Sequence, residues 1–150
     1  MACHNRVMGL LSAQDEATLK EHLSVITLPV QLVLFTQAFG GTDSGELAKQ
    51  VINEIASLND KVTLVEKSFI LDTEDKAKYN VDKAPAIVIL SDGIDTRMRM
   101  YGAPTGYEFV GLVEAIIVAG TGKIDLDPET MTWIQAVDKP THIQVFSTPT

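Results

Sequence analysis

Two strongly apolar runs far apart in the sequence constrain the fold of this chain more than any other feature. The run from Val30 to Phe35 does not alternate cleanly between apolar and polar residues, which is typical of a strand covered on both faces. The second run, residues 86–90, directly follows Pro85. Because helix-like segments lie before, between and after these runs, the sequence predicts an α/β domain with buried central strands.

Helical and strand patterns alternate through residues 1–122. Ser12 with Asp15, Asp43 with Glu46, and Thr105 with Glu108 have the spacing of helix N-terminal caps. The expected elements are a helix from residue 12 to before Pro29, a strand at 30–36, a helix from 43 to 58, a strand from 62, a short helix at 73–79, strands at 86–90 and 95–101, and a helix from 105 to 120. This order predicts a mixed sheet flanked by helices on both faces.

The turn signal Ser91-Asp92-Gly93 predicts a β-hairpin between the strands at 86–90 and 95–101. Within the second of these strands, Arg97 and Arg99 fall on one face if the alternation is regular. Two interpretations are open for these arginines: a solvated face of the hairpin, or a surface that binds an acidic partner.

The last residues have the pattern of an unfinished unit. Asp127 followed by Pro128 predicts the start of a helix, and residues 143–146 read as a strand. Helix followed by strand repeats the order of residues 12–36. We therefore expect residues 1–122 to form one unit and residues 123–150 to be the opening helix and strand of a second, incomplete unit.

Two stretches carry a family resemblance. The segments Lys49–Ile55 and Leu58–Thr63 form one of them, and the more specific one is Tyr101–Phe109, which reads Tyr-Gly-Ala-Pro-Thr-Gly-Tyr-Glu-Phe. Both resemble the first half of the tandem glutaredoxin-like protein disulfide oxidoreductases. They are equally similar to the N-terminal domain of the flavoprotein component of alkyl hydroperoxide reductase. The resemblance implies a thioredoxin-like fold and, for a parent protein, dithiol–disulfide exchange.

In active relatives the turn from strand to helix carries Cys-x-x-Cys, and the helix N-terminus stabilises a thiolate. The matching positions here are Thr42, Asp43, Ser44 and Gly45, so the resemblance implies a unit with no catalytic residues. Asp43 and Ser44 permit two interpretations. The preferred one is that Asp43 caps the helix, and the other is that the helix N-terminus binds an anion.

The resemblance also implies a cis bond between Ala84 and Pro85, in a loop that faces the turn at residues 42–45. The single cysteine, Cys3, excludes an intramolecular disulfide. Cys3 and His4 do not suggest a metal site, because His22 and His142 lie on separate elements and zinc needs three or four convergent ligands. We therefore expect neither metal nor cofactor.

Charge and hydropathy exclude other classes of protein. The net charge is −8, with only 12 lysines and arginines spread along the chain, which argues against a nucleic-acid-binding surface. No apolar run has the ~18 residues of a membrane span, and no signal-peptide pattern is visible. The cytoplasm is the expected location.

Two functions fit these observations. The first is a non-catalytic unit of a two-unit dithiol–disulfide oxidoreductase or peroxide-reductase electron donor, where it acts as a scaffold for the active unit. The alternative is a stand-alone module that holds an extended peptide between Thr42–Gly45 and Ala84–Pro85. The expected partner is a second thioredoxin-like unit or another copy of the chain. Two outcomes are open for the strand at 143–146: it folds back onto its own domain, or it joins two chains in a homodimer, which is the preferred outcome.

Overall fold

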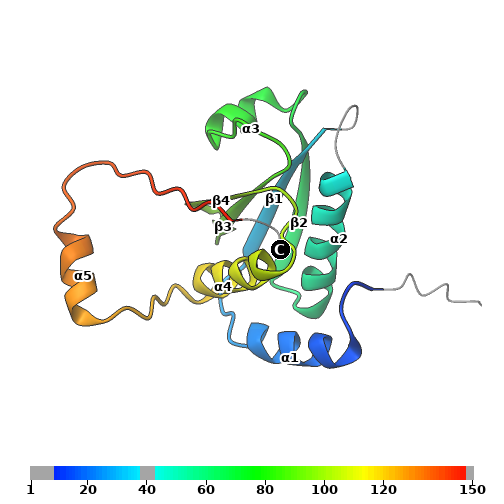
Figure 1. The fold of residues 1–150 in the computed structure, drawn as a ribbon, viewed down its shortest axis with the longest axis horizontal. Coiled ribbons are helices and arrows are strands. Elements are labelled where there is room, and N and C mark those ends of the chain that lie inside the picture. Colours follow the sequence, from blue (N-terminus) through cyan, green and yellow to red (C-terminus); the bar gives the residue numbers. More distant parts are fainter. Residues whose placement is uncertain (1–8, 38–42, 148–150) are drawn as a thin grey trace, which may run out of the picture.

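A four-stranded mixed sheet forms the centre of the protein in a computed structural model that describes residues 9–37 and 43–147 (Figure 1). The elements in chain order are α1 (Ala13–Leu23), β1 (Val30–Thr36), α2 (Asp43–Leu58), β2 (Val62–Ser68), α3 (Thr73–Lys78), β3 (Ala86–Ser91), β4 (Ile94–Tyr101), α4 (Tyr107–Thr121) and α5 (Pro128–Gln135). The predicted order of helices and strands is therefore confirmed through α4.

The strands lie in the order β2-β1-β3-β4. β1 pairs with β2 in parallel and with β3 antiparallel, and β3 pairs with β4 antiparallel. The parallel pair requires a crossover, which α2 supplies. The hairpin closes through Asp92 and Gly93, whose φ angles of 47° and 79° suit a two-residue turn. The predicted mixed sheet and its hairpin are both present.

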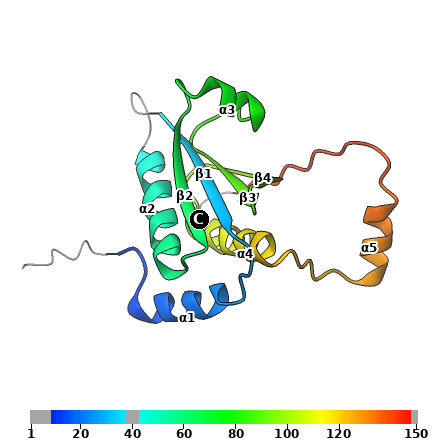
Figure 2. The same cartoon turned by 180° about the vertical axis from the view of Figure 1, so that it is seen from behind.

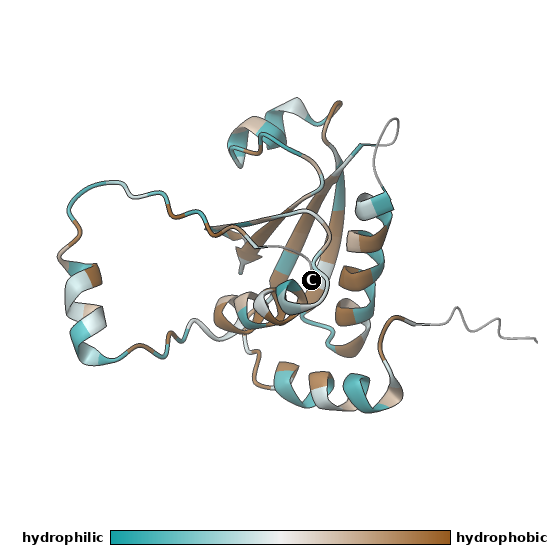
Figure 3. Cartoon of the chain, in the orientation of Figure 1, coloured by the Kyte–Doolittle hydropathy of each residue, from teal (hydrophilic) through white to brown (hydrophobic). Residues whose placement is uncertain are grey.

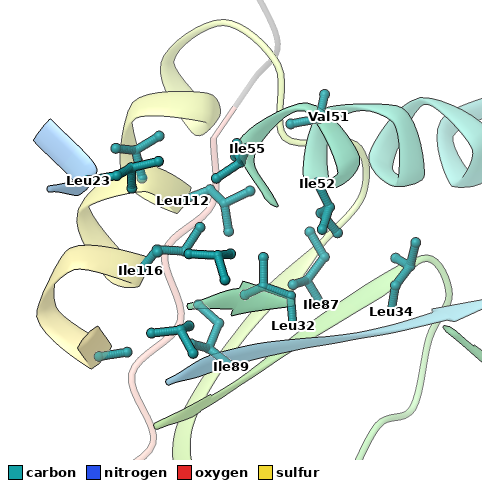
Figure 4. Packing of buried hydrophobic residues seen from close by; sticks show 14 of the residues in the cluster. Leu23, Leu32, Leu34, Val51, Ile52, Ile55, Ile87, Ile89, Leu112 and Ile116 are labelled. Carbon is teal, nitrogen blue, oxygen red and sulfur yellow. The ribbon is translucent and has the colours of Figure 1, made fainter. Parts of the chain in front are cut away.

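Both faces of β1 are buried, as the sequence predicted. Leu32 and Leu34 pack on one face together with α1, α2 and α4 (Figure 4). Val33 and Phe35 pack on the other, against Tyr79 and the residues that follow α3. Successive strand residues point to opposite faces, so a strand covered on both sides reads as an unbroken apolar run.

The end of α4 packs closely against the segment between α1 and β1. The carbonyl oxygen of Gly120 accepts backbone hydrogen bonds from Thr27 and Leu28, at N···O distances of 2.9 and 2.8 Å. Both Gly120 and Ile26 are buried. A Cβ at position 120 would lie 2.6 Å from one Ile26 side-chain carbon and 2.9 Å from another. Glycine is therefore required here by the closeness of the contact.

The structure corrects the alternation expected for β4. A bulge interrupts the pairing between Val88 and Leu90, and Arg97 has a φ of 64° there. Because a bulge adds an unpaired residue, Arg97 does not follow the regular alternation that would place it beside Arg99. Arg97 is exposed, whereas Arg99 is partly buried in contacts with its own chain.

Arg99 forms a two-pronged ion pair with Asp95. Its two terminal nitrogens donate to the two carboxylate oxygens at 2.8 and 2.7 Å, and its Nε donates to the carbonyl oxygen of Tyr79 at 3.0 Å. The Arg99 hydrogen bonds hold the pKa of Asp95 below its usual value, although partial burial opposes them. Arg99 thus joins β4 to the residue after α3.

Two cap assignments are corrected as well. The residue before α4 is Gly106, with a φ of 57°, and no side chain caps this helix. Thr105 instead accepts the Glu108 N–H through its backbone carbonyl oxygen, so the predicted Thr105 cap is wrong. Asp43 is the first residue of α2 rather than the residue before it.

The chain after α4 leaves the sheet and its helices. We call residues 123–147 the C-terminal arm, and none of them is buried. As predicted, Asp127 caps α5, accepting the Thr130 N–H at 2.9 Å. The predicted strand at residues 143–146 is wrong for this structure: the segment pairs with no other strand in residues 9–37 and 43–147, and a strand needs a neighbour to satisfy its backbone groups. Figures 1 and 2 show the arm bulging outward from α4 and returning toward the sheet.

We expect Gly120→Ala and Gly111→Ala to change stability in opposite directions. The first forces a methyl group against Ile26 and should lower the free energy of unfolding by about 1–3 kcal/mol. The second adds a methyl group to the same helix with no heavy atom within 4 Å, so better helix propensity should raise stability by up to about 1 kcal/mol. Urea unfolding of both variants measures the difference, and equal midpoints would contradict the close contact.

We also expect Asp95→Asn to destabilise the fold in a pH-dependent way. A carboxyl group whose folded-state pKa is lowered stabilises the fold above its unfolded pKa, and this contribution is lost as the pH falls through the folded-state pKa. At pH 7 the loss in the free energy of unfolding should be about 1–2 kcal/mol, and the difference from wild type should begin to narrow below about pH 4 and vanish only below the folded-state pKa. Asp92→Asn, in the exposed turn, is the control. If the difference in the free energy of unfolding between Asp95→Asn and wild type were the same at pH 3 and pH 7, the ion pair would not be its cause.

Candidate functional site

The predicted site lies where β1 ends and α2 begins. β1 ends at Thr36, and α2 begins at Asp43. Thr42, one of the four predicted positions, lies outside the described residues. The other three, Asp43, Ser44 and Gly45, form the first turn of α2. Asp43 is exposed, and Ser44 and Gly45 are half-buried.

Gly45 packs beside Thr36. A Cβ built on Gly45 would lie 3.5 Å from the Thr36 methyl carbon, which is ordinary van der Waals contact. A side chain the size of cysteine therefore has room to begin at position 45. Packing at position 45 would therefore allow a cysteine, although the sequence has glycine there.

Ala84 and Pro85 directly precede β3, which pairs with β1, and they lie near the same C-terminal end of β1. The peptide bond between them is cis, and the Pro85 carbonyl oxygen accepts the Gly102 N–H at 3.0 Å. Ala86 pairs with Phe35 in the antiparallel register, so Pro85 is the next residue opposite Thr36. Thr36 is thus the common neighbour of Pro85 and Gly45.

The electrostatics at this helix end do not favour a bound anion. The first turn of α2 contains the carboxylates of Asp43 and Glu46. Negative side chains near a helix N-terminus interact favourably with its positive end, and they repel a second anion there. Between the two interpretations of Asp43, the geometry favours stabilisation of the helix by its own acidic residues over anion binding.

The loop after β2 also borders this end of the sheet, and the sequence analysis did not identify it. The Phe69 N–H donates to the Thr36 carbonyl oxygen at 2.8 Å. The next two residues, Ile70 and Leu71, are 59% and 81% exposed. The signal in the sequence was the apolar run Phe69-Ile70-Leu71, which follows the strand that begins at residue 62.

The described part of the chain contains no group of three or more His, Cys, Asp or Glu residues arranged to hold a metal ion. Cys3 and His4 lie outside the described residues. None of the helices in residues 9–37 and 43–147 has the length and apolar character needed to cross a membrane. The described residues near Thr36 include no thiol.

Curated proteins with similar sequences share one name, alkyl hydroperoxide reductase AhpF. The chain is 28% identical over 137 residues to the AhpF of Pseudomonas putida, covering 91% of this chain and 24% of that protein. It is 30% identical over 111 residues to the AhpF of Escherichia coli K12, covering 74% and 19%. The chain thus spans about a quarter of the length of the curated relatives it matches. No protein-family model matches it.

Solved structures agree with these relatives. The NTD_N/C domain of the alkyl hydroperoxide reductase AhpF from Enterococcus faecalis superposes with a TM-score of 0.77 at 25% identity, covering 86% of this chain and 62% of that one. A protein disulfide oxidoreductase from Aeropyrum pernix superposes with a TM-score of 0.71 at 20% identity, covering 83% and 54%. At that identity the second match supports the fold alone.

The sheet, its flanking helices and these superpositions define the chain as a thioredoxin-like unit. More particularly, it is a unit similar to the N-terminal domain of alkyl hydroperoxide reductase AhpF. The resemblance read from Tyr101–Phe109 is thereby confirmed.

We expect a dithiol introduced at the predicted positions to form a disulfide. In a Cys3→Ser background, Thr42→Cys with Gly45→Cys restores the Cys-x-x-Cys spacing of the active relatives. Thiol titration before and after mild oxidation measures closure. The matched control is Thr42→Cys with Ser44→Cys, which places the second thiol one residue earlier and so lacks the Cys-x-x-Cys spacing. If the first pair closes no better than the control, positions 42 and 45 do not match the family's cysteines.

Proposed function

We propose that this chain is a non-catalytic thioredoxin-like unit of a dithiol–disulfide oxidoreductase or peroxide-reductase electron donor, and that it acts as a scaffold for the active unit. The observation that carries the proposal is the composition of the first turn of α2. Asp43, Ser44 and Gly45 stand at the end of the central strand, next to Thr36 and opposite the Pro85 loop, with no cysteine among them. In this proposal the turn at residues 42–45 takes the place of the cysteine-containing turn of active thioredoxin-like units, and its sequence, Thr-Asp-Ser-Gly, has no thiol.

The chemistry of the parent requires those thiols elsewhere. In dithiol–disulfide exchange a thiolate attacks one sulfur of a disulfide, forms a mixed disulfide and releases the other sulfur as a thiolate. A second thiol then resolves the mixed disulfide. The only sulfhydryl of this chain is Cys3, which has no second cysteine to resolve such an intermediate.

The domain division is part of the proposal. Residues 1–122 would be the complete unit, and residues 123–150 would begin a second unit that holds the working cysteines. The exposed arm supports this division, because α5 repeats the capped-helix start of α1 but is not buried. The short coverage of the curated relatives is also consistent with further units in those proteins. The reading frame after Thr150 offers a direct check: the proposal expects Cys-x-x-Cys to follow.

We expect the chain by itself to have no disulfide reductase activity. In an insulin-reduction assay with dithiothreitol, the rate should equal that of the protein-free blank, because no pair of thiols is available to cycle. Cys3→Ser is the matched control for side reactions of the single thiol. Turnover above the blank that survives Cys3→Ser would overturn the proposal.

A further inference from the structure

A pocket of about 180 Å³ lies between α2, the start of α4 and the residues that precede α1. Its large apolar side chains are those of Leu10, Leu11, Leu47, Val51, Pro104 and Phe109. Glu54 is the one charged residue among the described residues that line it. An apolar cavity of about 150 Å³ in another protein stays free of water and binds benzene. This pocket therefore has the size and the lining for a small apolar molecule.

The residues before α1 close one side of the pocket, and we call residues 9–11 the strap. Figure 3 shows this apolar segment directly before the polar start of α1. Leu11 packs against the main core cluster, whereas Leu10 is 49% exposed, and none of the three strap residues is fully buried. Segments with few buried contacts open at low cost in free energy. The strap is therefore the part of the lining that can move with the least loss of packing.

The carboxylate of Glu54 holds the strap against α2. Its Oε1 accepts the Leu10 N–H at 2.6 Å, and its Oε2 accepts the Leu11 N–H at 3.1 Å. Hydrogen bonds to an ionised group are stronger than those between neutral groups. The next residue, Ser12, caps α1. The strap is thus held to α2 by the Glu54 side chain and is anchored to α1 at its end.

A larger hollow beside the strap gives a route of entry to the pocket. The hollow has a volume of about 1260 Å³, is open to solvent and follows α2 from Asp43 to Ser57. Leu11 and Glu54 line both the hollow and the pocket. The strap therefore separates the two spaces, and a molecule can pass between them when the hydrogen bonds to Glu54 open.

We propose that the pocket binds a small, neutral, apolar molecule about the size of benzene, and that the strap controls its entry. The size follows from the volume of the pocket, and the ring of Phe109 offers an aromatic contact. An anion is disfavoured by the Glu54 carboxylate and by the net charge of −8. The ligand is a free molecule rather than a side chain of a partner, because the strap can close again only over a molecule that is not attached to another protein.

A titration of the 150-residue chain with benzene, followed by nuclear magnetic resonance, tests the binding site. We expect saturable shifts in the signals of Leu11, Val51 and Phe109, which come from the three segments that form the pocket. Benzoate adds a negative charge to the same ring. It should bind at least about tenfold more weakly than benzene, because its charge would enter an apolar pocket beside Glu54.

Glu54→Gln tests the role of the strap. Glutamine has one acceptor oxygen where glutamate has two, and it carries no charge. The amide hydrogens of Leu10 and Leu11 should therefore exchange with solvent at least about tenfold faster than in wild type. The disadvantage of benzoate relative to benzene should also shrink. Glu46→Gln is the matched control, because Glu46 is an exposed acid earlier on the same helix and does not line the pocket.

Four results would overturn the inference. They are the absence of saturable shifts with benzene, shifts that lie away from the pocket, benzoate binding as tight as that of benzene, and amide exchange of the strap that is no faster in Glu54→Gln than in Glu46→Gln. The same spectra establish that each variant is folded. The scaffold role does not enter this argument, so these results leave the outcome of the insulin assay unaffected.

Discussion

Burial of β1 and β3 on both faces is the constraint on which the rest of the structure depends. Each strand sends alternate side chains into two separate apolar clusters, one under α1, α2 and α4 and one beside the residues after α3. This arrangement requires helices on both sides, a crossover for the parallel pair and a tight turn for the antiparallel pair. It also fixes the end of β1, where Thr36 lies between the start of α2 and the Pro85 loop.

The parts of the fold that depend on interactions between residues close together in the chain could be predicted from the sequence. The doubly covered strands, the Ser12 cap and the Asp92-Gly93 turn each depend on residues close together in the chain. The predictions from sequence were wrong where the local structure depends on pairing with a strand that is far away in the sequence or absent. The bulge that separates Arg97 from Arg99 depends on pairing with β3, and residues 143–146 have β-type residues but no strand to pair with. A pattern of side chains cannot supply a hydrogen-bonding partner.

Only part of the candidate site could be predicted, because its arrangement also depends on contacts between elements that are far apart in the sequence. The positions at the start of α2 and the Pro85 loop followed from a family resemblance, which encodes the tertiary arrangement that spacing alone does not. The Phe69–Leu71 loop was missed because its place beside Thr36 depends on a backbone hydrogen bond between elements far apart in the sequence.

The close contact at Gly120 has a mechanical consequence for the arm. The Gly120 carbonyl oxygen is held by two backbone hydrogen bonds from the segment that leads into β1, and the arm begins three residues later. These bonds tie the end of α4 to the segment that leads into β1, so the arm departs from a point that is hydrogen-bonded beside the central strand. The backbone anchor for the arm and the entry to β1 are therefore one and the same contact.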